Sequence, residues 1–271
     1  MATTRRRFII ATFIVACAAV AVIITSFATS LWVEATLTKP NDAAFSTSLT
    51  INYGLFVGHI DGKMLSSISA ELTMSCLMSE NVCLMSCQTD DATQEFELIA
   101  LLSGIESIHC PFLEESTNIS EDSYDQKFIN AGIWVSTLLF LALSLLAAVL
   151  AAVFAVINSA MNPVEPIVGV FGLYVWNGIA AGCTLIVMIL WGAMFAITLT
   201  DNVAYSQTIS GEYTSQGQAS LGVSYWLLLI SLLLHIVNLS LLGIRQYLLS
   251  REPPTPTVKM DENTDGIIFL Y

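Results

Sequence analysis

The hydrophobic pattern of the chain is dominated by one long apolar stretch, residues 131–157. It contains no charged residue and no proline. As a helix rising about 1.5 Å per residue it would reach about 40 Å, more than the roughly 30 Å hydrocarbon core of a bilayer. A core helix of a soluble protein is seldom apolar on every face over such a length. The stretch therefore predicts a transmembrane helix.

Three more apolar stretches predict three further spans, at residues 8–31, 169–199 and 221–243. The segments between and beyond the spans are polar: 1–7, 32–130, 158–168, 200–220 and 244–271. The last of these is rich in proline and polar residues, and we expect it to be disordered. The predicted fold class is all-α transmembrane, a four-helix bundle with a small disulfide-bearing extracellular region of β and irregular structure.

The first apolar stretch has two interpretations, an uncleaved span or a cleaved signal peptide. It is longer than the roughly 7–15-residue apolar region of a signal peptide. Trp32 follows it, where an interfacial aromatic anchor is expected. Both features favour a span, but Ala28-Thr29-Ser30 resembles a cleavage site and keeps the alternative open.

Composition agrees with a membrane protein. Hydrophobic residues make up 55% of the chain and charged residues 11%, with a mean hydropathy of +0.72. A soluble domain has about 25% charged residues. The net charge of −13 comes largely from residues 32–130, where Asp and Glu far outnumber Lys. The chain has no basic patch, which argues against nucleic acid as a partner.

The basic residues indicate the orientation in the bilayer. They flank the outermost spans, as Arg5, Arg6, Arg7, Arg245, Arg251 and Lys259. Four spans place both termini on one side, and the positive-inside rule makes that side cytosolic. Segments 32–130 and 200–220 would then face outward. The connection 158–168 has no Lys or Arg, so this orientation depends on the termini alone.

The large polar segment contains one β-type pattern and most of the cysteines. Phe45–Val57 is bounded by Asp, Asn and Pro on one side and Gly58 on the other, which predicts a small sheet or hairpin on the membrane surface. Its cysteines are Cys76, Cys83, Cys87 and Cys110. In an oxidising compartment they would form two disulfides in any of three pairings. Zinc, with His109 as an extra ligand, is the alternative, but no C-x₂-C pair is present.

Two N-glycosylation sequons occur. Asn118-Ile119-Ser120 lies in the same outward segment as the four cysteines, and we expect it to be modified. Asn238-Leu239-Ser240 lies inside the fourth span, beyond the reach of a transferase, and is expected to stay unmodified.

Three side chains within the spans are strongly polar, two amides and one imidazole: Asn177, His235 and Asn238. Polar side chains in lipid are costly and usually face a partner. Asn177 lies about 12 Å from the cytosolic start of span three, and His235 and Asn238 lie roughly 10–15 Å from the cytosolic end of span four. Residues three apart share a helical face. We therefore predict a hydrogen-bonded contact between spans three and four. The alternative, an ion or proton path, normally needs carboxylates, which the spans lack.

Next to this contact, Gly178 and Gly182 form a G-x-x-x-G, a pattern that lets helix backbones approach closely. It would allow close packing either within the bundle or against a second copy of the chain.

Enzyme motifs are missing from the sequence: there is no G-x-S-x-G, H-E-x-x-H, P-loop or Rossmann glycine fingerprint. We expect no catalytic residues, no metal and no cofactor.

Several short motifs resemble the clarin family, within the claudin-type plan of four spans with a large first outer loop. They are Leu31-Trp32, Tyr53-Gly54-Leu55-Phe56-Val57-Gly58, the stretch 172–178 (GLYVWNG), Ser224-Tyr225-Trp226 and the stretch 265–269 (DGIIF). Two features depart from claudins: Phe56 stands where they have Trp, and the first loop cysteine comes only at Cys76. The resemblance implies a non-enzymatic organiser of plasma-membrane complexes, of a kind associated with sensory hair cells and actin-rich protrusions.

The C-terminus offers one concrete interaction. Phe269-Leu270-Tyr271 is an apolar-x-apolar end, which a PDZ groove binds by strand addition and capture of the carboxylate. An accidental apolar end is the alternative.

The leading hypothesis is a clarin-like tetraspan scaffold in the plasma membrane, in contact with lipid, other membrane proteins and cytosolic PDZ-domain or actin-linked proteins. A claudin-like adhesion or barrier component, or an auxiliary channel subunit, are the alternatives.

Overall fold

Four long helices form the body of the structure, a computed structural model that describes residues 2–39, 49–63, 67–105, 110, 127–160 and 169–251. They are α1 (Ala2–Ala28), α3 (Ala131–Ala160), α4 (Val170–Met194) and α6 (Val223–Ser250), and α4 continues as a π-helix, η1 (Phe195–Leu199). In the described part of the chain, four helical segments are long and apolar enough to cross a membrane. Their bounds are Arg6–Ala28, Ala131–Ala160, Val170–Leu199 and Val223–Ser250. The structure is that of a multi-pass membrane protein.

The four helices form a ring in which each packs on two neighbours. α1 lies against α3 and α6, and α4 lies against the same two helices. Small buried side chains allow this close approach; they are Ala16, Ala19, Ala147, Ala148, Ala151, Ala155 and Ala180. Large apolar side chains such as Ile14, Ile189 and Ile197 point away from the bundle and are more than half exposed. Such a surface is stable only against lipid.

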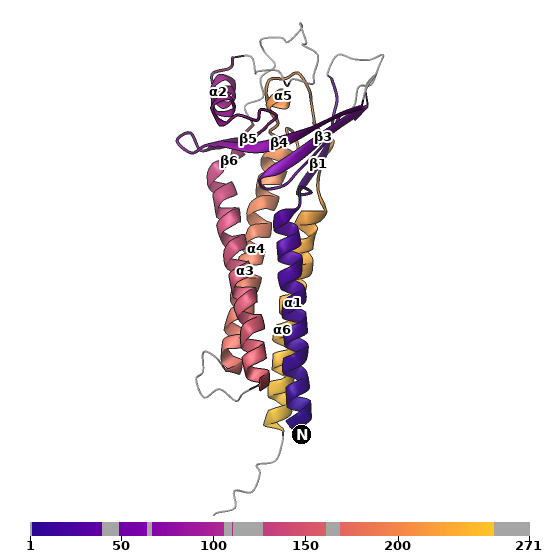
Figure 1. The fold of residues 1–271 in the computed structure, drawn as a ribbon, viewed down its shortest axis with the longest axis vertical. Coiled ribbons are helices and arrows are strands. Elements are labelled where there is room, and N and C mark those ends of the chain that lie inside the picture. Colours follow the sequence, from indigo (N-terminus) through magenta and orange to yellow (C-terminus); the bar gives the residue numbers. More distant parts are fainter. Residues whose placement is uncertain are drawn as a thin grey trace, which may run out of the picture.

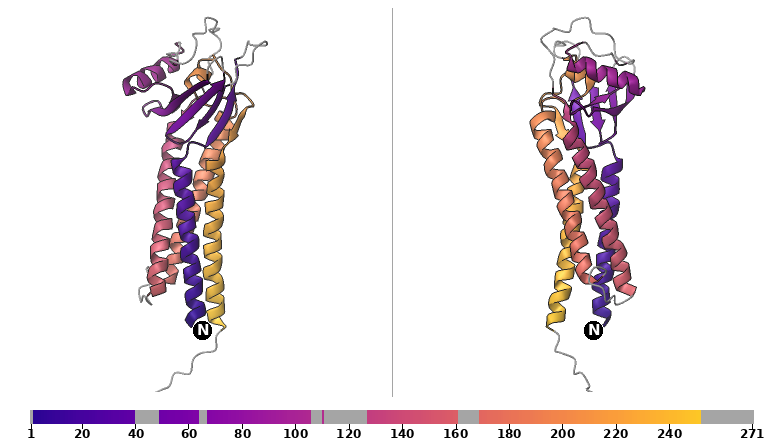
Figure 2. Two further views of the ribbon diagram at one scale, coloured as in Figure 1. Left: turned by 45° about the vertical axis from the view of Figure 1, so that its right-hand side comes forward. Right: turned by 90° about the vertical axis from the view of Figure 1, so that its left-hand side faces the viewer.

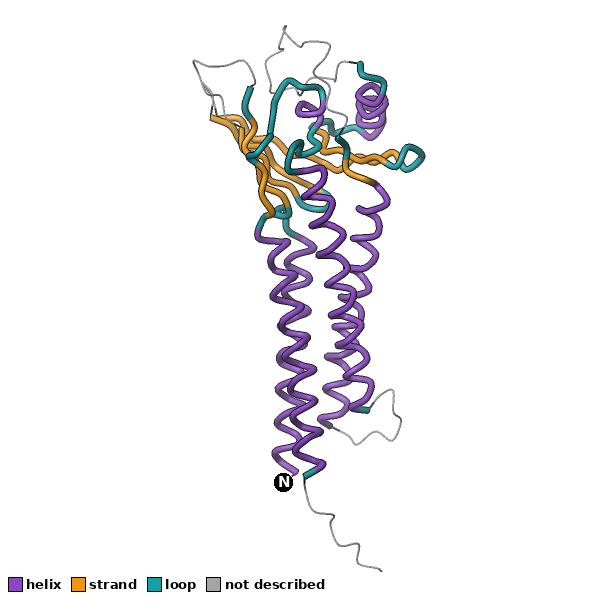
Figure 3. Tube along the Cα trace, turned by 180° about the vertical axis from the view of Figure 1, so that it is seen from behind, coloured by secondary structure: helices purple, strands orange, loops and turns teal. Residues whose placement is uncertain are grey.

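A seven-stranded sheet covers one end of the bundle (Figures 1 and 3). Its strands are β1 (Val33–Leu37), β2 (Leu49–Tyr53), β3 (Val57–Lys63), β4 (Ser67–Leu77), β5 (Val82–Ser86), β6 (Ile129–Asn130) and β7 (Ala219–Leu221). All neighbours pair antiparallel, in the order β6-β5-β4-β3-β2-β1-β7. With α2 (Asp91–Leu102) and α5 (Ser206–Ile209) they form the head, which comprises the described residues within 29–130 and 200–222.

Both polar segments of the chain therefore contribute to one sheet. β7, from the second segment, pairs with β1 from the first, with Val33 opposite Leu221. The N-terminus and the end of α6 lie at the opposite end of the bundle from the head (Figures 1 and 2). The head is thus a single body held by α1, α3, α4 and α6 together.

The all-α fold class is wrong in this respect, because the sheet is a substantial second component and the fold is helical and β together. The pattern in Phe45–Val57 predicted a small sheet or hairpin, and the sheet observed has seven strands. The other strands gave weaker signals: β3 (VGHIDGK) contains two glycines, an Asp and a Lys, which are all depleted in strands. Such residues are tolerated here because neighbouring strands on both sides complete the hydrogen bonding.

Trp32 is also placed differently from the prediction. It is completely buried rather than at the lipid interface. Its indole Nε1 donates to the Ser26 carbonyl at 2.8 Å, and its ring meets Trp191 edge-on at 5.2 Å between centroids. The helix ends at Ala28, so Trp32 already belongs to the head.

The spans differ slightly from their predicted bounds. α1 begins at Ala2 and includes the arginines of segment 1–7, α3 continues to Ala160, and α6 continues to Ser250, beyond the last apolar run. Helices can extend past the hydrocarbon region because their backbone hydrogen bonds are internal, so apolar run length underestimates helix length.

One glycine at the junction of head and bundle provides a test of this packing. Gly222 has an ordinary extended backbone (φ −81°, ψ 178°), but a Cβ there would overlap the Leu31 carbonyl. We expect Gly222→Ala to destabilise the full chain by about 1–3 kcal/mol through overpacking. Gly243→Ala on α6 is the control, because a Cβ at Gly243 would approach the Tyr174 hydroxyl no closer than 4.0 Å. Thermal unfolding in detergent measures both, and equal stabilities would contradict the junction as described.

Candidate functional site: the head and the buried polar contact

Two disulfides brace the head. Cys76 pairs with Cys83, its cross-strand partner between β4 and β5, with Cα atoms 4.1 Å apart. Cys87, just after β5, pairs with Cys110. The structure thus selects one of the three pairings and leaves these four sulfurs bonded to each other rather than to zinc. Among the described residues no group of three His, Cys, Asp or Glu side chains could hold a metal.

A buried polar cluster surrounds the second disulfide. The Tyr205 hydroxyl lies 3.0 Å from Cys110 Sγ, and because a disulfide sulfur carries no proton the phenol is the donor. Gln207 Nε2 donates to the same sulfur at 3.6 Å. Burial raises the pKa of the Tyr205 phenol well above its usual value, and the nearby Glu97 and Glu212 carboxyl groups raise it further. The phenol therefore stays protonated and keeps donating to the sulfur.

The second polar segment is fixed to the strands of the first by backbone groups. Met85 of β5 donates its N–H to the Ala204 carbonyl at 2.9 Å, and the fully buried Tyr53 hydroxyl of β2 donates to the Val203 carbonyl at 2.9 Å. These contacts satisfy polar groups that would otherwise be buried without partners. They are structural contacts rather than a nucleophile and base arrangement.

The helix α2 carries an exposed apolar face that sequence reasoning missed. Asp90 caps its N-terminus by accepting from the Thr93 N–H at 3.2 Å, and Leu98 and Leu101 pack on Leu84 of β5. On the opposite side Phe96 and Ile99 are exposed, 63% and 45% respectively. The available signal was the Asp90 cap followed by leucines three apart. We call Phe96 and Ile99 the α2 apolar face.

Inside the bundle, the structure brings together Asn177, His235 and Asn238. Asn177 Oδ1 lies 3.1 Å from His235 Nδ1 and accepts from Asn238 Nδ2 at 3.1 Å, while Asn177 Nδ2 donates to the Leu173 carbonyl at 2.9 Å. All three side chains are completely buried. One amide of α4 therefore holds two residues of α6, and the second sequon at Asn238 is enclosed within the bundle.

The G-x-x-x-G is not part of the bundle interior. Gly178 and Gly182 are exposed on α4, and a Cβ on either would meet nothing within 4 Å. The motif therefore does not serve packing between the helices of the bundle, which was one of its two predicted uses. Cys183, one residue further, is buried, and Cys17 is exposed on α1.

Three predicted features lie outside the described residues: the sequon at Asn118, the C-terminal Phe269, Leu270 and Tyr271, and His109. They stay predictions.

The comparisons with known proteins point to one group. The chain is 33% identical to human Clarin-3 over 137 residues, which are 49% of this chain and 59% of that protein. It is 26% identical to mouse Clarin-3 over 275 aligned positions, covering 99% of this chain and 100% of that protein. Rat Clarin-3 is 25% identical over 232 positions, 84% of this chain and 82% of that protein. No protein-family model matches. The chain is thus similar to the Clarin-3 proteins at low identity.

The buried contact predicts energetic coupling between α4 and α6. Replacing Asn177 by Ala removes the acceptor that His235 and Asn238 share, and replacing Asn238 by Ala removes one of its donors. In a double-mutant cycle we expect a coupling energy between about 0.6 kcal/mol, the average measured for such bonds in membranes, and about 1.7 kcal/mol, the largest value measured. Unfolding in mixed detergent micelles measures it. Ser240→Ala, on the exposed side of α6, is the neutral control; strictly additive effects of the two Asn changes would contradict the contact.

We expect removal of the two disulfides to lower the stability of the fold by different amounts. The Cys87–Cys110 bond closes a separation of 23 residues and Cys76–Cys83 one of 7, so chain entropy gives about 3.4 and about 2.4 kcal/mol respectively. We expect the Cys87→Ser/Cys110→Ser chain to unfold at a lower temperature than the Cys76→Ser/Cys83→Ser chain, measured by tryptophan fluorescence. The reverse order would contradict this account.

Proposed function

We propose that this chain is a clarin-type tetraspan protein that organises complexes in the plasma membrane without catalysing a reaction. The observation that carries the proposal is the head: strands from both polar segments make one disulfide-braced sheet, with α2 on its far side from the bundle (Figures 1 and 2). The exposed Phe96 and Ile99 belong to this helix. The similarity to mouse Clarin-3 over its full length supports the family assignment.

We further propose that the head faces the extracellular side and both termini face the cytosol, with the first span retained. Arg6 and Arg7, near the start of α1, and Arg251, just after α6, all lie on the side of the bundle away from the head. By the positive-inside rule this side would be cytosolic. The disulfides lie at the opposite end, which suits an oxidising compartment. Asn118 would then be glycosylated on the outer side.

The two ends of the molecule would contact different partners. Phe96 and Ile99 form an exposed apolar pair on an otherwise well-packed helix, and such patches often mark protein interaction sites. At the cytosolic end, Phe269-Leu270-Tyr271 would bind a PDZ domain and so reach actin-linked proteins. A second copy of the chain, packed through Gly178 and Gly182, is a further partner for the membrane region.

Affinity purification from native membranes in mild detergent tests the organiser role. Three altered chains are compared with the intact one: a chain lacking residues 269–271, a Phe96→Ser/Ile99→Ser chain, and a Glu95→Ser chain as the control on the same exposed side of α2. We expect cytosolic scaffold proteins to be lost with the truncation and membrane partners to be lost with Phe96→Ser/Ile99→Ser, while Glu95→Ser retains both.

Two results would contradict the proposal. Recovery of a pore-forming subunit, irrespective of the tail, would indicate an auxiliary channel subunit. Recovery of only a copy of the chain on an adjoining cell, together with exclusion of soluble tracers by cell layers, would indicate a claudin-like barrier component.

A further inference from the structure

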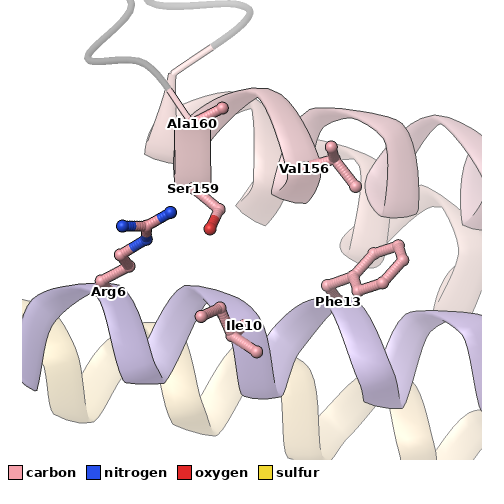
Figure 4. A pocket seen from close by; sticks show the side chains of 6 residues that line it. All are labelled: Arg6, Ile10, Phe13, Val156, Ser159 and Ala160. Atoms are coloured by element: carbon pink, nitrogen blue, oxygen red, sulfur yellow. The ribbon is translucent and has the colours of Figure 1, made fainter.

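A groove runs along the outer surface of the bundle between α1 and α3. At the end away from the head it opens into a cavity of about 240 Å³ lined by Arg6, Ile10, Phe13, Val156, Ser159 and Ala160 (Figure 4). A second cavity of about 270 Å³ adjoins it toward the head and shares Phe13 and Val156 with the first. Its other lining residues are apolar, Cys17, Ala152 and Val153 among them. Because the two cavities share Phe13 and Val156, they lie end to end along the α1–α3 seam, and we call them together the α1–α3 groove.

Small side chains make this space. Cys17 on α1 and Ala152 and Ala160 on α3 stand where larger residues would fill the seam between the helices. Both helices carry exposed apolar residues here: Ile10 on α1 is 41% exposed, and Val153 and Val156 on α3 are 46% and 47% exposed. The groove therefore opens toward the bilayer, and its occupant must come from the lipid phase.

The length of the groove matches one leaflet. Its lining on α1 runs from Arg6 to Val20, which is about 21 Å along a helix. Half of a bilayer, hydrocarbon and headgroup region together, is about 20–22 Å thick. The groove thus begins at the level of the headgroups and ends close to the middle of the membrane.

The chemistry of the groove changes along this length. At its mouth the Arg6 side chain extends from α1 toward the Ser159 hydroxyl of α3 (Figure 4). A guanidinium presents two N–H groups in the geometry that a phosphate accepts, and a hydroxyl adds a further donor. Deeper in, the lining is apolar. A cationic donor set above an apolar channel of one leaflet's depth is complementary to an anionic phospholipid.

We propose that the α1–α3 groove binds an anionic phospholipid, with its phosphate at Arg6 and Ser159 and one acyl chain along Phe13, Val153 and Val156. The remaining acyl chain lies in the surrounding bilayer. This assignment requires only that the four helices span a membrane, and it is independent of the organiser role.

Lipid binding to the purified full chain tests the proposal, with native mass spectrometry as the measurement. The probes are phosphatidylserine and phosphatidylcholine with identical acyl chains. We expect the intact chain to retain phosphatidylserine about fivefold more strongly, the magnitude associated with one basic residue at the membrane surface. Arg6→Gln should remove this preference. Arg7→Gln removes the same charge from the neighbouring position on α1, outside the groove lining, and should keep it.

A second pair of variants tests the acyl channel. Ala152→Phe fills the groove and should lower retention of both lipids, whereas Ala18→Phe, on an exposed part of α1 outside the lining, should not. If Ala152→Phe fails to fold, the arginine pair still decides the matter. Equal losses with Arg6→Gln and Arg7→Gln would overturn the proposal in favour of diffuse attraction to the membrane surface. Displacement of bound phosphatidylserine by soluble glycerophosphoserine or by a sterol at equal concentration would also overturn it.

Discussion

The structure depends on the contacts of Trp32, at the point where the helical bundle becomes the sheet. Its backbone N–H donates to the Tyr53 carbonyl of β2 at 3.0 Å, and its own carbonyl accepts from Gly222, just before α6, at 3.0 Å. The indole donates to Ser26 of α1 and meets Trp191 of α4. One residue thus joins three of the four span helices to the sheet. An aromatic ring that is fully buried and fully hydrogen-bonded contributes large apolar area without leaving a polar atom unpaired.

The strand pairing of β1 with β7 follows directly from that junction. Leu31 accepts from the Ser224 N–H at 2.9 Å, so α1 and α6 enter the head side by side and the strands next to them continue as a ladder. The head is therefore joined to the bundle by backbone hydrogen bonds at several points rather than by a single linker. A head joined in this way would hold the interaction site that we propose on α2 in one orientation, which would reduce the conformational entropy lost on binding a partner.

The two parts of the molecule differ in how well the sequence predicts them, for a physical reason. A bilayer requires long uninterrupted apolar runs, so each span is visible in the local sequence, and even the contact of Asn177 with His235 and Asn238 follows from depth and helical spacing. The two edges of the sheet, where β7 pairs with β1 and β6 with β5, depend on partners far apart in the chain. β7 is three residues long and has no recognisable alternation of polar and apolar residues. It is a strand because it pairs with β1, which lies more than half of the chain length before it in the sequence. The exposure of Gly178 and Gly182 is likewise a property of helix rotation, which a G-x-x-x-G pattern alone does not determine.

The seams between the spans differ in what fills them. The α3–α4 seam is closed by Ser144, whose hydroxyl lies 2.7 Å from that of Thr184 and 3.1 Å from the Ala180 carbonyl. The α4–α6 seam is closed by the Asn177 contact, and the α1–α6 seam by Ser26, which donates to the Ser224 carbonyl at 2.7 Å. Interhelical hydrogen bonds and small-residue packing are what hold helices together in lipid, where the hydrophobic effect gives no preference between a neighbouring helix and an acyl chain. The α1–α3 seam opens into the groove described above, and by the same argument an acyl chain can fill it at little cost. A bound phospholipid would then act as a packing element of the bundle, with Arg6 selecting its headgroup.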